Sequence, residues 1–97
     1  MKVSFLKRAL IDQLRETEFW RLQDPALPAE FLKELENAVR DIIMAPNGHI
    51  LVSETHGLRR YYEKRFHTHI IYQHIPAEDS IRIVRIYNAR MRPIRFD

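Results

Sequence analysis

The sequence contains no cysteine and only two glycines among its 97 residues. Without cysteine the chain can form neither a disulfide framework nor a thiolate metal site, and its composition is compatible with the reducing cytosol. Two glycines are too few for a glycine-rich phosphate-binding loop, and both stand where turns are expected. The composition therefore argues against a disulfide-stapled secreted domain and against a nucleotide-binding loop.

Long apolar runs are also absent. The amino-terminal stretch MKVSFLKRAL has no apolar segment long enough for a signal peptide, and nowhere do about 18 apolar residues run together. We therefore expect a soluble, cytoplasmic protein with no membrane partner. Hydrophobic residues still make up 45% of the chain, which is enough to bury a modest core, so we expect residues 1–97 to form a single domain.

Positive charge is concentrated in the carboxyl-terminal part of the chain. Residues 57–97 carry nine basic and four acidic side chains, a net charge of +5, whereas residues 1–56 carry seven basic and nine acidic ones, a net charge of −2. A basic, arginine-rich surface suits contact with nucleic acid or with an acidic protein. The alternative is that these arginines only keep solvent-facing strand edges soluble.

The first part of the sequence predicts a short strand and a helix. Val3 and Phe5 alternate with polar residues, which is typical of a strand that joins a later sheet. From Lys7 to Gln23 there is neither glycine nor proline, so this stretch is expected to be an amphipathic helix with its apolar side on the sheet and Trp20 as a core anchor. The apolar surface of that helix is predicted to consist of Leu6, Leu10, Leu14, Phe19, Trp20 and Leu22.

A second helix follows a break at Asp24, Pro25 and Pro28. It is expected to end at Ala45-Pro46-Asn47-Gly48, because proline cannot continue a helix and glycine allows a left-handed exit. Its helical periodicity is the clearest in the chain and is carried by Phe31, Leu32, Leu35, Ala38, Val39, Ile42 and Ile43.

The remainder of the chain predicts strands. Residues 49–53 are expected to form a short strand, and residues 58–65, 66–75 and 80–88 an antiparallel meander broken at Gly57 and at the Pro76 to Asp79 turn. Because strands and helices do not alternate, a parallel doubly wound sheet is not expected. We predict an α+β fold in which an N-terminal helical hairpin packs on one face of a small, mainly antiparallel sheet and leaves the other face open.

The two-residue period of a strand assigns side chains to these faces. The side facing the helices is expected to hold Ile70, Tyr72, Val84 and Ile86. The open side is then expected to hold His69, Arg85 and Tyr87.

Several segments together resemble the RelE/ParE superfamily of bacterial toxins. They are the helical hairpin with its Pro46 and Gly48 exit, the Gly-Leu-Arg-Arg at residues 57–60, the Ile-Ile-Tyr at residues 70–72, and the run from Ile83 to Met91. The resemblance implies the toxin of a type II toxin–antitoxin, plasmid-stabilisation-type module, neutralised by a cognate antitoxin protein. Within the superfamily, RelE-like members cut messenger RNA on the ribosome, and ParE-like members inhibit DNA gyrase without a known catalytic centre.

The RelE-like pattern of basic residues is incomplete in this chain. Arg60 falls where such toxins place a strand lysine, but Tyr62 falls where they place a second one, and His69 stands where an arginine is usual. Arg90 matches an arginine after the last strand, whereas Phe96 falls near an expected tyrosine and cannot move a proton. If the chain is a metal-independent ribonuclease, the candidate catalytic residues are Arg60, His69, Tyr87 and Arg90. An acid or base could also come, in another arrangement, from Tyr62 or His67.

The carboxyl-terminal run RIYNARMRP is closer to the ParE pattern, although Asn88 replaces a histidine and Arg92 an acidic residue. We therefore favour a ParE-like toxin that binds gyrase, over a RelE-like ribonuclease acting on mRNA and a non-toxic relative that only binds its antitoxin. Whether the protein is an enzyme stays open at this point. The candidate target-binding residues are Arg60, Tyr62, Arg85, Tyr87, Arg90, Arg92 and Arg95.

A zinc site is the other arrangement that the histidines suggest. His67 and His69 are two residues apart, which would place both on one face of a strand. No cysteine or paired carboxylate completes a tetrahedral set, so we expect neither a metal nor another cofactor.

Overall fold

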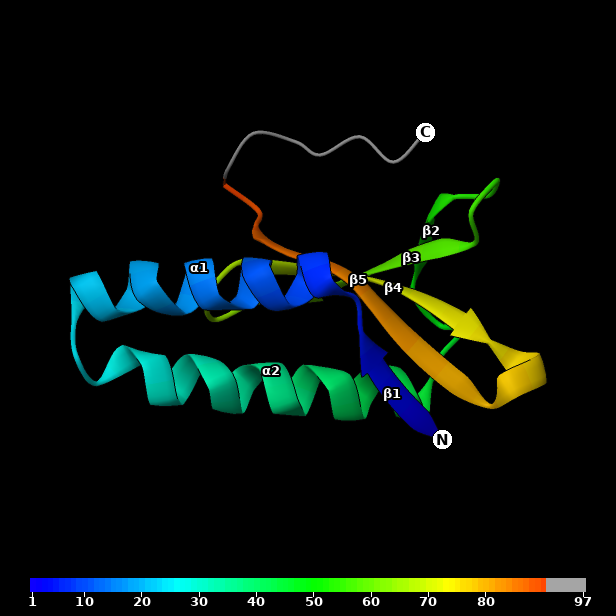
Figure 1. Ribbon diagram of the computed structural model, residues 1–97, viewed down its shortest axis with the longest axis horizontal. Helices are drawn as coiled ribbons and strands as arrows, with labels where there is room; N and C mark the ends of the chain where they lie inside the picture. The colour runs from blue at the N-terminus through cyan, green and yellow to red at the C-terminus, as the bar shows by residue number, and fades with distance from the viewer. Residues whose placement is uncertain (91–97) are drawn as a thin grey trace.

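A computed structural model describes residues 1–90, which form a helical hairpin packed on one face of a five-stranded sheet (Figure 1). This arrangement confirms the predicted α+β fold. The expectations for Arg92, Arg95 and Phe96 lie outside the described residues. The elements are β1 (Lys2–Phe5), α1 (Lys7–Gln23), α2 (Leu27–Met44), β2 (Ile50–Ser53), β3 (Leu58–Glu63), β4 (Thr68–Ile75), a 3-10 turn (Pro76–Glu78) and β5 (Ser80–Asn88).

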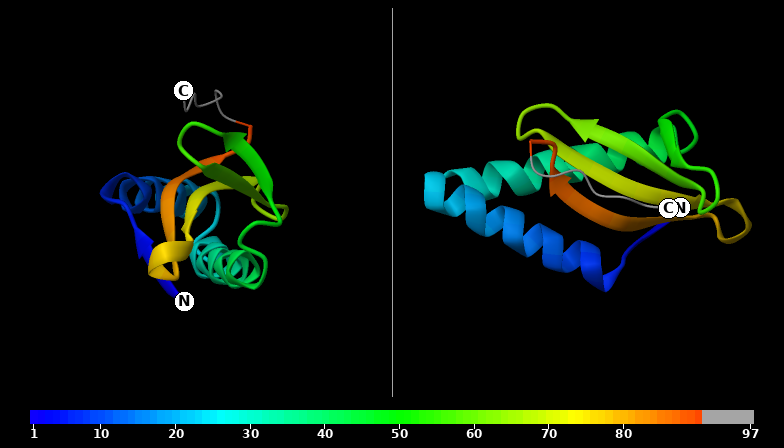
Figure 2. Two further views of the ribbon diagram at one scale, coloured as in Figure 1. Left: turned by 90° about the vertical axis from the view of Figure 1, so that its right-hand side faces the viewer. Right: turned by 90° about the horizontal axis from the view of Figure 1, so that it is seen from above.

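The strands lie in the order β1-β5-β4-β3-β2. The pairs β2–β3, β3–β4 and β4–β5 are antiparallel, as the predicted meander requires, whereas β1 is parallel to β5. Seen end-on in Figure 2, the strands curve over the two helices, which lie on one side of the sheet. The other side of the sheet is left without a helix, so side chains on its central strands are available for a site.

Helix α2 buries the stripe that its periodicity predicts. Phe31, Leu35, Ala38 and Ile42 are spaced by three or four residues and are all buried in the core. Trp20 of α1 packs against this core, with its ring 5.0 Å from that of Phe66 in an edge-to-face arrangement. No helix within residues 1–90 is long and apolar enough to cross a membrane.

Helix α1 has the predicted bounds but not the predicted orientation. Its buried side chains are Ala9, Asp12 and Glu16, and the leucine stripe is turned away from the sheet. Leu10 is 48% exposed and Leu14 is 71% exposed. The expectation that the leucine side of α1 packs on the sheet is therefore wrong, because two carboxylates face β5 and the apolar stripe is left for another contact.

A β-bulge in β5 shifts which of its side chains face the helices. Ile71 of β4 lies opposite Arg85, but the next residue, Tyr72, lies opposite Ile83, so Val84 has no partner on β4. As a result Ile83 and Ile86 are both buried in the core, and Val84 is only half-buried. The prediction for Val84 is wrong for this reason, whereas those for Ile70, Tyr72 and Ile86 are confirmed.

Three tight turns depend on a left-handed backbone. Gly57 has φ 63°, and Asp79 has φ 48° with its N–H donating to the carbonyl of Pro76. His67 has φ 54°, which is uncommon for a residue other than glycine. The carbonyl of His67 accepts a hydrogen bond from the N–H of Ala89 at 2.6 Å, so the turn between β3 and β4 is tied to the end of β5.

Candidate functional site

Three aromatic side chains form a row across the open face of the sheet. His69 on β4 lies opposite Tyr62 on β3 and opposite Tyr87 on β5. The His69 ring centroid is 5.3 Å from that of Tyr62 and 5.2 Å from that of Tyr87, and both contacts are edge-to-face. The structure thus brings together Tyr62, His69 and Tyr87, three of the residues expected from the sequence.

Two further contacts, both made by His67, connect this row to Arg90. The Nη2 of Arg90 lies 2.8 Å from the Nε2 of His67, and the Nδ1 of His67 lies 2.9 Å from the hydroxyl of Tyr62. Because an arginine can only donate, the Nε2 of His67 is the acceptor in its contact with Arg90, and its Nδ1 faces the Tyr62 hydroxyl. His67 therefore holds both the guanidinium of Arg90 and the hydroxyl of Tyr62.

The protonation of His69 and Tyr87 follows from their surroundings. The Nδ1 of His69 lies 3.2 Å from the Tyr87 hydroxyl. Burial, and then the positive charge of Arg60, lower the pKa of His69, while burial raises the pKa of Tyr87. His69 is consequently neutral at neutral pH and able to accept a proton, and Tyr87 keeps its own.

Arg60 lies in the next row of the same face, opposite Ile71, and is half-buried. Arg85 lies opposite Ile71 on the other side, but its Nε donates to the Oδ2 of Asp12 on α1 at 2.7 Å. Arg85 thus lies on the open face as predicted with its charge already paired with a carboxylate, and its expected contact with a target stays a prediction. Arg60 and Arg90 are left as the cations beside the aromatic row.

The other histidines do not join this row. His49 contacts the hydroxyl of Tyr72 at 3.0 Å, and His74 contacts the side-chain oxygen of Asn47 at 2.9 Å. Tyr72 is fully buried and its hydroxyl also donates to the carbonyl of Pro46, so this pair fastens the end of α2 to the sheet. Within residues 1–90, no group of three or more histidines and carboxylates is placed to hold a metal ion.

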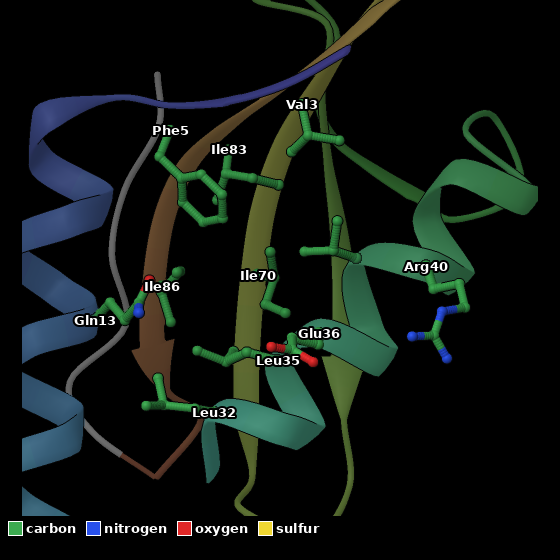
Figure 3. Close-up of a pocket in the computed structure, with 11 residues that line it drawn as sticks. Val3, Phe5, Gln13, Leu32, Leu35, Glu36, Arg40, Ile70, Ile83 and Ile86 are labelled. Carbon is green, nitrogen blue, oxygen red and sulfur yellow. The ribbon is translucent and has the colours of Figure 1, made fainter. Parts of the chain in front are cut away.

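A groove on the opposite side of the molecule forms a second candidate surface. It has a volume of about 550 Å³ and lies between α1, α2 and β1, with Ile70, Ile83 and Ile86 of the sheet at its base (Figure 3). Leu10 lies one turn from Gln13, which lines the groove, so the exposed leucine stripe of α1 continues the apolar surface beyond it. The remaining residues that line the groove are Val3, Phe5, Leu32, Leu35, Glu36, Val39 and Arg40.

Sequence reasoning missed the two buried carboxylates of α1, one of which pairs with Arg85 on the open face of the sheet. Asp12 and Glu16 are four residues apart, so they share one face of α1 with Ala9, and the absence of leucine from that face was the available signal. From the sequence, His67 was considered as an acid or base and as a zinc ligand, and not as a partner of Arg90. Its role in holding Arg90 depends on the turn geometry, which the sequence does not reveal.

The comparisons with known proteins bear on the fold. The chain matches no protein-family model and has no significant match among curated proteins. One chain of the chromosomal ParDE toxin–antitoxin system from P. aeruginosa superimposes with a TM-score of 0.77 at 17% identity, covering 93% of this chain and 97% of that one. A chain of the intact E. coli RelBE toxin–antitoxin complex superimposes with a TM-score of 0.57 at 15% identity, covering 93% and 98%.

The isolated E. coli RelE toxin superimposes with a TM-score of 0.57 at 15% identity, covering 94% of this chain and 86% of that one. The protein therefore has the fold of the RelE/ParE toxins. Within that fold it lies closer to the ParDE chain than to the RelE chains.

Proposed function

We propose that the protein is the toxin of a type II toxin–antitoxin module, and that it acts as a ParE-like toxin by binding DNA gyrase. The observation that carries this proposal is the closer match of the fold to the ParDE chain, with a TM-score of 0.77 against 0.57 for RelE. The carboxyl-terminal RIYNARMRP run supports the same choice. A binding mode of action needs a presented surface and no catalytic group.

The open face of the sheet is the proposed target-binding surface. Its aromatic row is held in place by the hydrogen bond between His69 and Tyr87 and by the bond from Tyr62 to His67, so little side-chain entropy is lost when a partner binds. Tyrosine and arginine are also the residues that contribute most often to the energy of protein interfaces. The described residues proposed to contact the target are Arg60, Tyr62, Tyr87 and Arg90.

The apolar groove is the proposed site for the antitoxin. Leu10 and Leu14 of the neighbouring helix α1 are exposed although the helix has polar residues available for solvent, which indicates a surface that a partner covers. An amphipathic helix that lays its apolar side into a groove is a common way to bind such a surface. The antitoxin would then neutralise the toxin from the face opposite the aromatic row.

The direct test is controlled expression of this chain in a bacterial host, with incorporation of labelled thymidine and labelled methionine followed in parallel over the first minutes. If the proposal is correct, DNA synthesis falls first. A Tyr62→Ala, Arg90→Ala double variant should lose this effect, whereas Arg21→Ala should keep it, because Arg21 lies on α1 and pairs only with Glu18 within residues 1–90. An earlier fall in translation would overturn the gyrase target.

A second candidate function is a ribosome-dependent ribonuclease, and one observation favours it. His69 is kept neutral beside Arg60, and a neutral imidazole next to a cation is suited to accept a proton from a ribose hydroxyl whose phosphate the cation binds. Cleaved transcripts in a purified translation system, absent with His69→Ala, would establish this function. If neither synthesis falls, the chain is a non-toxic relative that binds an antitoxin.

The antitoxin site has its own test. Leu32 lines the groove and is 36% exposed, so Leu32→Glu should preserve toxicity but abolish rescue by the co-expressed antitoxin. Met44→Glu is the matched control, because Met44 lies on the same helix as Leu32, is 80% exposed and does not line the groove. Full rescue of Leu32→Glu would place the antitoxin elsewhere.

A further inference from the structure

Glu16 of α1 is a buried carboxylate that has no hydrogen-bond partner within residues 1–90. Its side chain is only 4% exposed, and its Oε1 receives no hydrogen bond from residues 1–90. Burial, and then the nearby charge of Asp12, raise the pKa of Glu16, although the charge of Arg15 opposes this. An unpaired buried carboxylate is costly, and its presence calls for a group that satisfies it.

Asp12 lies one turn earlier on the same face of α1 and is also buried, yet its carboxylate is hydrogen-bonded. Asp12 accepts two hydrogen bonds from Arg85 and one from the N–H of Ile86, all supplied by β5. Farther along β5, Asn88 offers Glu16 no hydrogen bond, and its own side-chain oxygen accepts from the N–H of Arg90. Strand β5 therefore supplies hydrogen bonds to Asp12 but none to Glu16.

Two further unsatisfied atoms belong to residues that are neighbours of this part of the fold. The indole nitrogen of Trp20, one turn farther along α1, is buried without an acceptor, and so is the hydroxyl of Thr68, which lies opposite Asn88 on β4. These are the three buried side-chain atoms without partners among residues 1–90. Since native proteins satisfy nearly all such atoms, the unsatisfied carboxylate of Glu16 marks a place that receives a polar group from outside.

A pocket opens beside Glu16. It has a volume of about 180 Å³ and is lined by Arg15, Glu16, Phe19 and Asn88. A single water needs only about 10–15 Å³ of such volume, so the pocket has room for a side chain. Phe19 is 45% exposed and presents an aromatic ring beside the carboxylate.

We propose that this pocket binds the guanidinium group of an arginine side chain presented by a bound protein. Guanidinium supplies the positive charge and the paired donors that a buried carboxylate lacks, and it also packs on an aromatic ring, which Phe19 provides. The proposal does not depend on which target the toxin inhibits. It assigns to the pocket a chemistry that neither the aromatic row nor the apolar groove has.

The test uses the full chain and a capped arginine, N-acetyl-arginine methylamide, with capped citrulline as its neutral counterpart. Trp20 is the only tryptophan, so its indole N–H resonance reports on this part of the fold without ambiguity. We expect a saturable shift with capped arginine at a millimolar Kd, as befits a single side chain. Capped citrulline should bind at least about tenfold more weakly, because it lacks the charge.

Two adjacent substitutions should change this binding in opposite directions. Glu16→Gln removes the carboxylate and should abolish the shift, whereas Arg15→Gln removes a competing cation at the pocket and should tighten binding. Amide spectra of both variants verify that the fold is intact. The proposal is wrong if citrulline binds as well as arginine or if Glu16→Gln binds normally. Equal binding of free L-arginine, which carries its own carboxylate, would overturn the assignment to a protein side chain.

Discussion

Asp12 of α1 and Arg85 of β5 form the ion pair that joins the helical hairpin to the last strand. The Nε of Arg85 donates to the Oδ2 of Asp12 at 2.7 Å, and the same oxygen accepts the N–H of Ile86 at 3.0 Å. Strand β1 pairs with β5 only as far as Ile83. Asp12 thus takes the place of a neighbouring strand beyond that residue and closes the edge of the sheet.

Asp12→Ala should therefore destabilise the protein by about 2–4 kcal/mol, because Asp12 is 3% exposed and its removal leaves a partly buried guanidinium and a backbone N–H without partners. Asp12→Asn keeps an acceptor and should cost less. Urea denaturation of both variants measures the change. An Asp12→Leu, Arg85→Leu double variant should lose less than the sum of the single changes, and strict additivity would contradict the pairing.

Glu16→Gln should raise the stability of the isolated protein at neutral pH. The pKa of Glu16 in the folded state is above the ordinary value of 4.5, because of burial and of Asp12. A carboxyl whose pKa is raised on folding contributes its stability below the unfolded pKa and loses it as the pH rises through the folded one. Thermal unfolding should show a higher Tm for the glutamine variant at pH 7 and equal values below about pH 4, relative to the wild type.

Tyr61→Phe should destabilise the contact between β3 and α2. The hydroxyl of Tyr61 donates to Asp41 at 2.6 Å, and its loss should cost about 0.5–1.5 kcal/mol. Burial and this bond raise the pKa of Tyr61 to about 12. The contribution is present below about pH 10 and is lost as the pH rises toward that value, so the difference from the wild type in urea denaturation should shrink above pH 10.

The pKa of His69 should be below the ordinary value of 6.5, because its imidazole is partly buried beside Arg60. A histidine whose pKa is lowered on folding contributes stability above the unfolded pKa, and that contribution is lost as the pH falls. NMR titration of the ring protons measures the pKa directly. Arg60→Gln should raise it, whereas Arg82→Gln should not, because Arg82 contacts Gln73 instead. An unchanged pKa in Arg60→Gln would show that burial alone is responsible.

The bounds of both helices and the succession of strands along the chain could be predicted because local signals set them, whereas the position of β1 beside β5 was not predicted. Proline and glycine mark the ends of α2, and runs of isoleucine, valine and tyrosine mark β3, β4 and β5. The orientation of α1 could not be predicted from the sequence, because it depends on a polar contact between α1 and the distant strand β5. The carboxylate of Asp12 is hydrogen-bonded to Arg85 and to the N–H of Ile86, more than seventy residues later in the chain. These bonds stabilise the observed orientation of α1 more than burial of its leucine side would stabilise the predicted one.

The candidate site was predictable to the extent that strand alternation holds. Tyr62, His69 and Tyr87 face the open side as alternation requires, since β3 and β4 pair without interruption there. The bulge at Val84 could not be foreseen, because no residue of β5 marks an extra position. The contact between His67 and Arg90 depends on a left-handed residue in a turn that contains no glycine.

The parallel pairing of β1 with β5 has a consequence for how the chain folds. Residues 2–5 hydrogen-bond to residues 80–83, so this contact has the longest separation along the chain of any strand pair in the sheet. Closing so long a loop is slow compared with forming the hairpins that join β3, β4 and β5. We therefore expect β1 to dock late in folding, after these three strands have already assembled the aromatic row.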